Sequence, residues 1–132
     1  MVHLRALAGT DFSLSAGGDL VCRTVRPDAE PWRIGIEDPH DPTRLVATVP
    51  VRNGAVATSG TAHRGSHLVD ARTGHAPEGV ASVTVVADSL TWADIDATAA
   101  YAHGVNAADW LRGRPGRTGV VVWADGRAEV VG

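Results

Sequence analysis

The chain has 132 residues and a net charge of −3, from 12 basic side chains, all arginine, and 15 acidic ones. With 44% hydrophobic and 20% charged residues it lies within the globular range, which excludes a disordered tail, a collagen-like repeat and a coiled-coil rod. Its length predicts one domain over residues 1–132. A pI near 6.0 argues against a general nucleic-acid binder, so we expect no nucleic-acid partner.

The sequence carries no signal for a membrane or an oxidising compartment. Cys22 is the single cysteine and cannot form an intrachain disulfide. No apolar run is long enough to span a bilayer, and the first residues lack the apolar core of a secretory signal. We therefore expect a cytoplasmic protein, unless a segment outside this sequence carries a signal.

The N-terminal part predicts a helix and then a β-hairpin. Residues 2–8 have a helical apolar pattern that stops at Gly9, a residue type common at helix ends. Apolar residues then alternate over 12–16 and 20–25, on either side of Gly17-Gly18. Two alternating runs joined by a glycine pair indicate antiparallel strands.

One further strand and a second hairpin are predicted next. Residues 32–36 alternate and are followed by two prolines within 38–42, where we expect a loop. Residues 45–51 lead into Asn53-Gly54, the strongest short turn dipeptide, and residues 55–59 return. The sequence therefore predicts that these last two runs pair with each other.

The second half of the chain combines strands with helices. Residues 60–79 hold almost no large apolar side chain, so this stretch is not core. The elements predicted after it are a strand over 81–87, an alanine-rich helix from 88 to about 104, a short helix over 106–111, a loop over 112–118, and a hairpin of 120–123 and 128–131 across Asp125-Gly126. This order favours an antiparallel-rich α+β domain over a doubly wound α/β one.

Asp94 and Thr98 are the first candidates for chemistry. Four residues apart in a predicted helix, their oxygens lie on one face, one turn apart. A carboxylate beside a hydroxyl suits Mg²⁺, which prefers oxygen ligands and takes only one or two from protein when phosphates supply the rest. The structural alternative is that Thr91 caps the helix and Asp94 meets the positive end of the helix dipole in the first turn. Spacing alone favours the cap.

A short polar turn around His67 is the second candidate. His67 is suited to act as a general base near neutral pH, and Arg72 to bind a phosphate in bidentate fashion. The structural alternative is a surface turn, in which Asp70 accepts backbone N–H groups and Thr73-Gly74 closes a bend.

Two other segments have both a structural and a functional interpretation. Residues 58–60, the sequence Thr-Ser-Gly, end a strand in small residues that let a ligand approach the backbone N–H groups, or form an ordinary strand end. Arg112, Arg114 and Arg117 predict a solvated basic loop rather than a nucleic-acid patch, because the chain is acidic overall.

In their order along the chain, the motifs resemble the C-terminal half of the ApbE family, the Mg²⁺-dependent FAD:protein FMN transferases. The resemblance runs from about Leu4 to Gly126. The matching segments are G-G-D in the first hairpin, W-R-I-G-I-E-D-P, N-G-A-V-A-T-S-G, H-L-V-D-A-R-T-G, S-V-T-V-V-A and A-D-I-D-A-T-A. Several unrelated motifs in the family's order make the resemblance specific.

The resemblance implies a T-fold-like α+β domain that transfers FMN from FAD to a Thr or Ser hydroxyl of an acceptor flavoprotein and releases AMP. The family's metal pair, in A-D-A-L-A-T-A, falls on Asp94 and Thr98, which reverses the preference for a cap. The family's flavin-transfer histidine falls on His67, our candidate base. The implied flavin-binding residues are Thr58, Ser59, Gly60, His67, Asp70, Arg72 and Thr73.

The chain also departs from the family pattern. Ala71 replaces the proline of D-P-R-T-G, and Ser15 replaces the asparagine before the glycine pair. The family's N-terminal half, with its G-x-x-x-K-G-[YW]-A-x-D segment, has no counterpart in this sequence. We therefore expect a homo-oligomer or a complementing N-terminal chain to complete the site. Two alternatives stay open: a truncated relative that binds flavin or Mg²⁺ without turnover, and a structural or interaction domain.

Overall fold

The computed structural model describes residues 12–16, 19–23, 30–60 and 78–132. The predicted helix over 2–8 and the predicted Gly17-Gly18 turn lie outside this part of the chain. No helix within it is long and apolar enough to cross a lipid bilayer. The elements are, in chain order, β1 (Phe12–Ala16), β2 (Asp19–Arg23), β3 (Trp32–Asp38), β4 (Asp41–Val51), β5 (Gly54–Gly60), β6 (Val80–Ala87), α2 (Leu90–Ala102), a 3₁₀ turn (Gly104–Asn106), α3 (Ala107–Arg112), β7 (Thr118–Trp123) and β8 (Ala128–Val131).

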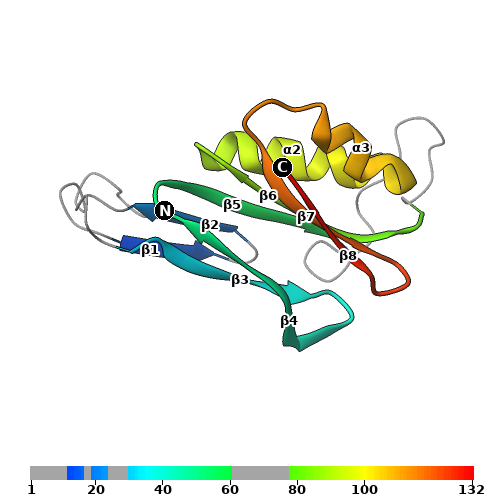
Figure 1. Cartoon of the computed structure of the whole chain (residues 1–132), viewed down its shortest axis with the longest axis horizontal. Coiled ribbons are helices and arrows are strands. Elements are labelled where there is room, and N and C mark those ends of the chain that lie inside the picture. The colour runs from blue at the N-terminus through cyan, green and yellow to red at the C-terminus, as the bar shows by residue number, and fades with distance from the viewer. Residues whose placement is uncertain (1–11, 17–18, 24–29, 61–77) are drawn as a thin grey trace.

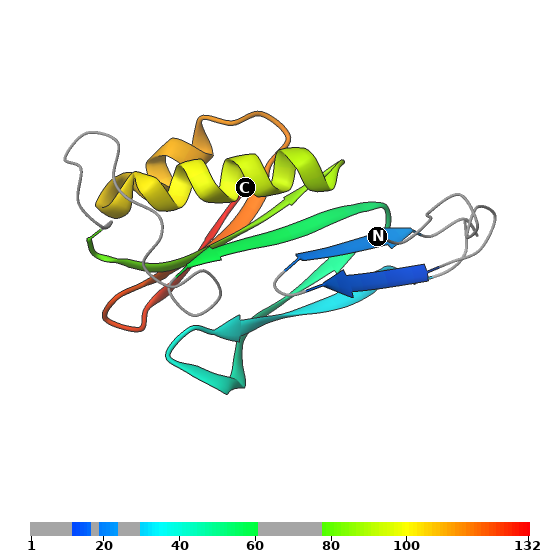
Figure 2. The same cartoon turned by 180° about the vertical axis from the view of Figure 1, so that it is seen from behind.

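The described residues form three layers. A six-stranded antiparallel sheet has the order β1-β2-β5-β6-β7-β8, and β3 and β4 form a separate two-stranded sheet. The helices α2 and α3 cover one face of the large sheet, and the β3–β4 hairpin lies on its other side (Figure 1), as the view from behind also shows (Figure 2). This confirms the antiparallel-rich α+β fold, with one main helix and one short helix.

The centre of the large sheet is buried on both faces. In β6 seven of the eight residues are buried, and Val83 and Val85 are 0% exposed because they lie under the helices. Val56 of β5 and Val122 of β7 instead face the β3–β4 hairpin, where they pack with Ile34 and Ile36. A strand buried on both faces reads as a continuous apolar run, which explains the S-V-T-V-V-A segment of β6.

The predicted hairpin across Asn53-Gly54 is wrong. β4 pairs with β3, from Trp32 opposite Val51 onwards, while β5 pairs with β2 on one side and β6 on the other. Since β5 already has a neighbour at each edge, it has no free edge for β4. The chain passes from the small sheet into the large one at residues 52–53.

The loop predicted over 38–42 is shorter than expected. Only Pro39 and His40 form the turn, and β4 begins at Asp41 with Pro42 inside it. The pairing register shifts between Ile36 and Asp38, so the opposite strand carries extra residues at this point. Proline is tolerated in such an irregular edge segment because no ladder hydrogen bond requires its missing N–H.

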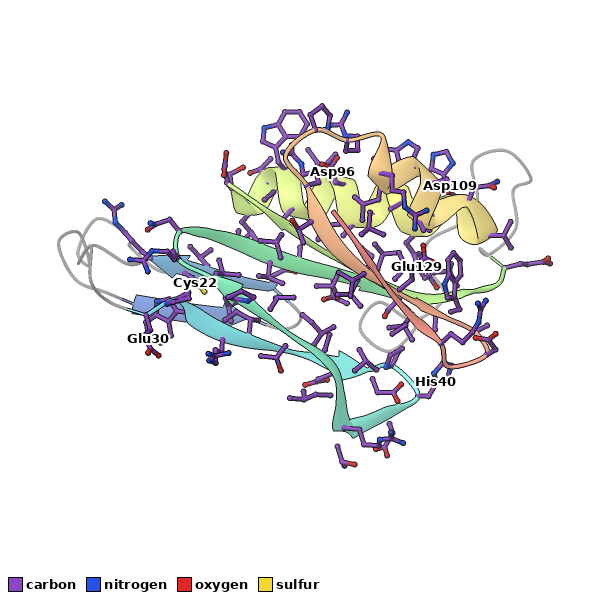
Figure 3. All side chains as sticks on the ribbon, in the orientation of Figure 1. Cys22, Glu30, His40, Asp96, Asp109 and Glu129 are labelled. Carbon is purple, nitrogen blue, oxygen red and sulfur yellow. The ribbon has the colours of Figure 1, made fainter. Side chains whose placement is uncertain are left out.

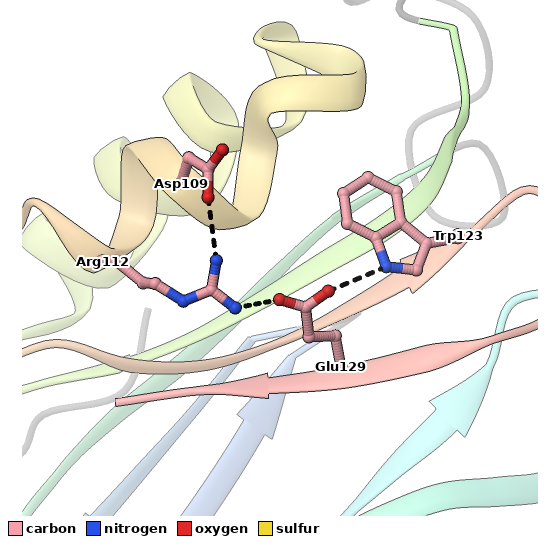
Figure 4. Close-up of polar contacts among 4 residues, drawn as sticks. All are labelled: Asp109, Arg112, Trp123 and Glu129. Atoms are coloured by element: carbon pink, nitrogen blue, oxygen red, sulfur yellow. Dashed lines mark hydrogen bonds and ion pairs between the residues drawn. The ribbon is translucent and has the colours of Figure 1, made fainter.

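Polar contacts fix α3 to the edge of the large sheet. Arg112 of α3 donates to Glu129 of β8 and, over 2.9 Å, to Asp109 one turn earlier (Figure 4). Glu129 also accepts from the indole of Trp123 over 3.3 Å. The predicted Asp125-Gly126 turn joins β7 to β8, and Gly126 has a φ of 94°, a conformation that favours glycine.

Candidate functional site

Asp94 is not part of the helix cap. The N-cap of α2 is Ser89, whose Oγ accepts from the backbone N–H of Trp92 over 3.3 Å. Asp94 is the fifth residue of α2, and the first turn holds no acidic side chain. The interpretation of Thr91 as the cap is therefore wrong, because the helix begins earlier than that pattern required. The capping role proposed for Asp94 is lost with it.

The side chain of Thr98 joins α2 to the end of β5. Its Oγ1 lies 3.2 Å from Oγ of Ser59, whose side chain is completely buried. Asp94 and Thr98 are themselves partly exposed and lie one turn apart on the same flank of α2. The structure thus brings together three of the predicted residues, from two elements far apart in the sequence.

Thr58 does not belong to this group. It lies on the opposite face of β5 from Ser59, and its Oγ1 is 2.8 Å from Oγ1 of Thr84 on β6. Gly60 ends the strand in close contact with β6, since a Cβ there would lie 2.6 Å from the carbonyl oxygen of Ala81. The glycine therefore serves close strand packing. The predicted set at 58–60 does not converge on one point through its side chains.

The remaining predicted flavin-binding residues, His67, Asp70, Arg72 and Thr73, lie outside the described part of the chain. Their assignment stays a prediction from the resemblance. The described residues around Asp94 are consistent with a hard cation, because a carboxylate and a hydroxyl are oxygen donors of the kind that Mg²⁺ prefers. Among those residues, no cluster of three or more His, Cys, Asp or Glu side chains offers a protein-only metal site.

Asp96 lies in a buried ion pair that no sequence pattern indicated. This carboxylate is only 1% exposed, and Nε of Arg117 donates to its Oδ2 over 2.5 Å. Arg114 lies 3.4 Å from its other oxygen. The prediction of a solvated loop is therefore wrong for Arg117, whose side chain is 17% exposed. Asp96 and Arg117 are 21 residues apart, so no local pattern could reveal the pair.

The fold agrees with the fold of known proteins of one family. The ApbE family model matches residues 2–122. The chain belongs to the ApbE family. It is 36% identical over 120 residues to a FAD:protein FMN transferase of Rhodobacter capsulatus. That alignment covers 83% of this chain and 22% of the Rhodobacter protein.

Solved structures of ApbE proteins have the same fold. The chain aligns with the ApbE protein of Thermotoga maritima at a TM-score of 0.76 and 30% identity, over 92% of this chain and 42% of that one. The apo flavinyl transferase ApbE of Pseudomonas stutzeri gives a TM-score of 0.74 at 28% identity, over 97% of this chain and 43% of that one. The chain thus spans less than half the length of these relatives.

Proposed function

We propose that this chain acts in protein flavinylation: the transfer of FMN from FAD to a Thr or Ser hydroxyl of an acceptor flavoprotein. The observation that carries the proposal is the Asp94–Thr98 pair on α2, with Thr98 hydrogen-bonded to Ser59 at the end of β5. The names of the family relatives support the substrate and the reaction type. FAD and the acceptor protein are then its partners.

In this proposal Asp94 and Thr98 hold Mg²⁺, which neutralises charge on the FAD pyrophosphate when bound. Ser59 orients the hydroxyl of Thr98 through their hydrogen bond. His67 accepts the proton of the acceptor hydroxyl, and Arg72 binds a phosphate oxygen. A P–O bond forms between the acceptor oxygen and the FMN phosphorus, the pyrophosphate bond breaks, and AMP leaves. Aligning these groups is the main contribution of the protein.

The proposal is tested with the full chain, FAD, MgCl₂ and an acceptor flavoprotein that carries the target threonine. Mass spectrometry should detect an acceptor heavier by one FMN. Asp94→Ala should abolish the adduct. The control is Asp109→Ala, which removes an exposed carboxylate on α3 and should leave the adduct unchanged. His67→Asn should lower the rate. If it does not, His67 is a binding or structural residue.

The alternatives give different results in the same assay. Flavin binding by fluorescence without an adduct would favour a relative that binds flavin without turnover. The absence of both flavin binding and the adduct would contradict the proposed function and leave a structural or interaction domain. An adduct that survives Asp94→Ala would contradict the metal assignment alone.

A further inference from the structure

The carboxylate of Asp96 lies where α2 meets the segment between α3 and β7 (Figure 3). Arg117 and Arg114 both come from this segment, and Nε of Arg117 forms the closer contact with the carboxylate, at 2.5 Å. A buried carboxylate is costly unless its partners are fixed in place. The pair therefore demands one particular placement of α2 relative to β7, which begins directly after Arg117.

Arg117 holds α2 at two points on the same flank. Its guanidinium contacts Asp96 and also lies 5.8 Å from the ring centroid of Trp92, one turn earlier in the helix. Successive helical residues are rotated by about 100°, so Asp94 and Thr98 lie on the opposite flank from Trp92 and Asp96. One flank is thus fixed by Arg117, and the other carries the metal pair.

The centre of the α2 face between these flanks is made of small side chains, and the larger buried Tyr101 lies near the end of the helix. Ala93, Ala97 and Ala100 are each 0% exposed and lie against the large sheet. Alanines allow a close approach, but they offer few large ridges that could interlock with grooves in the sheet. The packing of these alanines therefore sets the distance of α2 from the sheet more firmly than its rotation about its own axis. Directional polar contacts at the flanks, together with the packing of Tyr101, set the rotation.

We propose that Asp96, through Arg117, is a positioning residue that holds the rotation of α2 at which Thr98 meets Ser59 and Asp94 faces the metal site. The part that concerns the metal rests on the proposed function. The part that concerns the Thr98–Ser59 contact does not, because that contact exists in the chain without any ligand.

The test compares the full wild-type chain with Asp96→Asn, which keeps the shape and removes the charge. Arg117→Gln is the second variant, since it removes the closest partner of Asp96 and leaves the contact with Arg114. Glu129→Gln is the matched control, because Glu129 also forms an arginine ion pair that joins a helix to the sheet, but at α3 (Figure 4). Urea unfolding gives the stability of each variant.

Two measurements report the position of α2. The first is the nuclear Overhauser effect between the methyl group of Thr98 and the β protons of Ser59, measured without metal. The second is the affinity for Mn²⁺, used as a paramagnetic probe for the Mg²⁺ site. We expect Asp96→Asn and Arg117→Gln to weaken the nuclear Overhauser effect between Thr98 and Ser59. Asp96→Asn should also lower the affinity for Mn²⁺ by about tenfold, as is typical for residues that orient a metal ligand. Glu129→Gln should change neither.

The outcomes separate this proposal from the proposed function. If Asp96→Asn is destabilised like Glu129→Gln but keeps the Thr98–Ser59 signal, Asp96 is merely structural and the proposal is wrong. If Asp96→Asn and Arg117→Gln lose the Thr98–Ser59 signal and Glu129→Gln keeps it, the positioning role holds. It holds also if Asp94→Ala leaves Mn²⁺ binding unchanged. That last result would count against the metal assignment only.

Discussion

The side chain of Leu111 anchors α3 on the large sheet. It is completely buried, and its position is possible because β7 presents Gly119 beneath it: a Cβ there would lie 2.5 Å from Cδ2 of the leucine. Leu111→Ala leaves a cavity that the close-packed surroundings cannot fill, so we expect a loss of about 2–5 kcal/mol in the free energy of unfolding. Urea denaturation measures it.

Leu45→Ala is the matched control for this change. Leu45 lies in β4 and is 60% exposed, so the same substitution removes little buried area. We expect a change within about 0.5 kcal/mol. Equal losses in the two variants would contradict the packing described for Leu111.

Asp41, the first residue of β4, has a carboxylate held by two hydrogen bonds from Thr43. The hydroxyl of Thr43 donates to Asp41 over 2.6 Å, and this bond, followed by the backbone N–H of Thr43, lowers the pKa of Asp41 below its usual 3.8. A lowered pKa means that the stabilising bonds are present above pH 3.8 and are lost as the pH falls through the folded-state value.

Thr43→Val tests the cause of this shift. The variant keeps the backbone N–H but loses the hydroxyl, so the pKa of Asp41 should rise toward 3.8 without reaching it. A carboxyl carbon titration followed by NMR measures both values. An unchanged pKa in the variant would show that the hydroxyl is not the main cause.

At the scale of the element, the start of α2 depends on Ser89. Removing the N-cap acceptor leaves a backbone N–H without its partner, so Ser89→Ala should cost about 1 kcal/mol in unfolding free energy. Thr91→Ala, at the exposed position that the sequence suggested as the cap, should cost less than about 0.5 kcal/mol. The reverse order would place the cap at Thr91.

Elements with a local signal were predictable. The alternation over 12–16 and 32–36, the apolar run over 81–87 and the alanine-rich helix after residue 88 all appear in the structure close to the predicted bounds. Each of these signals depends on neighbouring residues only. The pairing of β4 with β3 was not predictable from Asn53-Gly54, because a turn dipeptide does not show that β5 already has two strand neighbours.

The same distinction holds for the candidate site. The spacing of Asp94 and Thr98 is local, so the sequence could place both on one flank of a helix. Their neighbour Ser59 lies 39 residues before Thr98, so the sequence could mark residues 58–60 as a ligand segment or a strand end but could not pair Ser59 with Thr98. The Asp96–Arg117 pair had neither kind of signal, since charged residues in a turn resemble a solvated loop until the fold brings them together.

At the scale of the whole molecule, the three layers are joined in different ways. Within the described residues, β3 and β4 have backbone pairing only with each other, whereas β5 and β6 are hydrogen-bonded to a strand on each side. The small sheet adheres to the large one chiefly through the apolar side chains shared between them. Its hydrogen bonds can therefore open without disrupting the large sheet.

This arrangement predicts unequal protection of backbone amides. The amides of β5 and β6 lie beneath α2 on one face and the hairpin on the other, so they should exchange only through global unfolding. The amides of β3 and β4 should exchange through a smaller opening, at a lower free energy. Hydrogen exchange measured across a series of low denaturant concentrations separates the two classes, because a local opening depends weakly on denaturant. Equal free energies and equal denaturant dependence in all four strands would mean that the hairpin and the large sheet unfold as one cooperative unit.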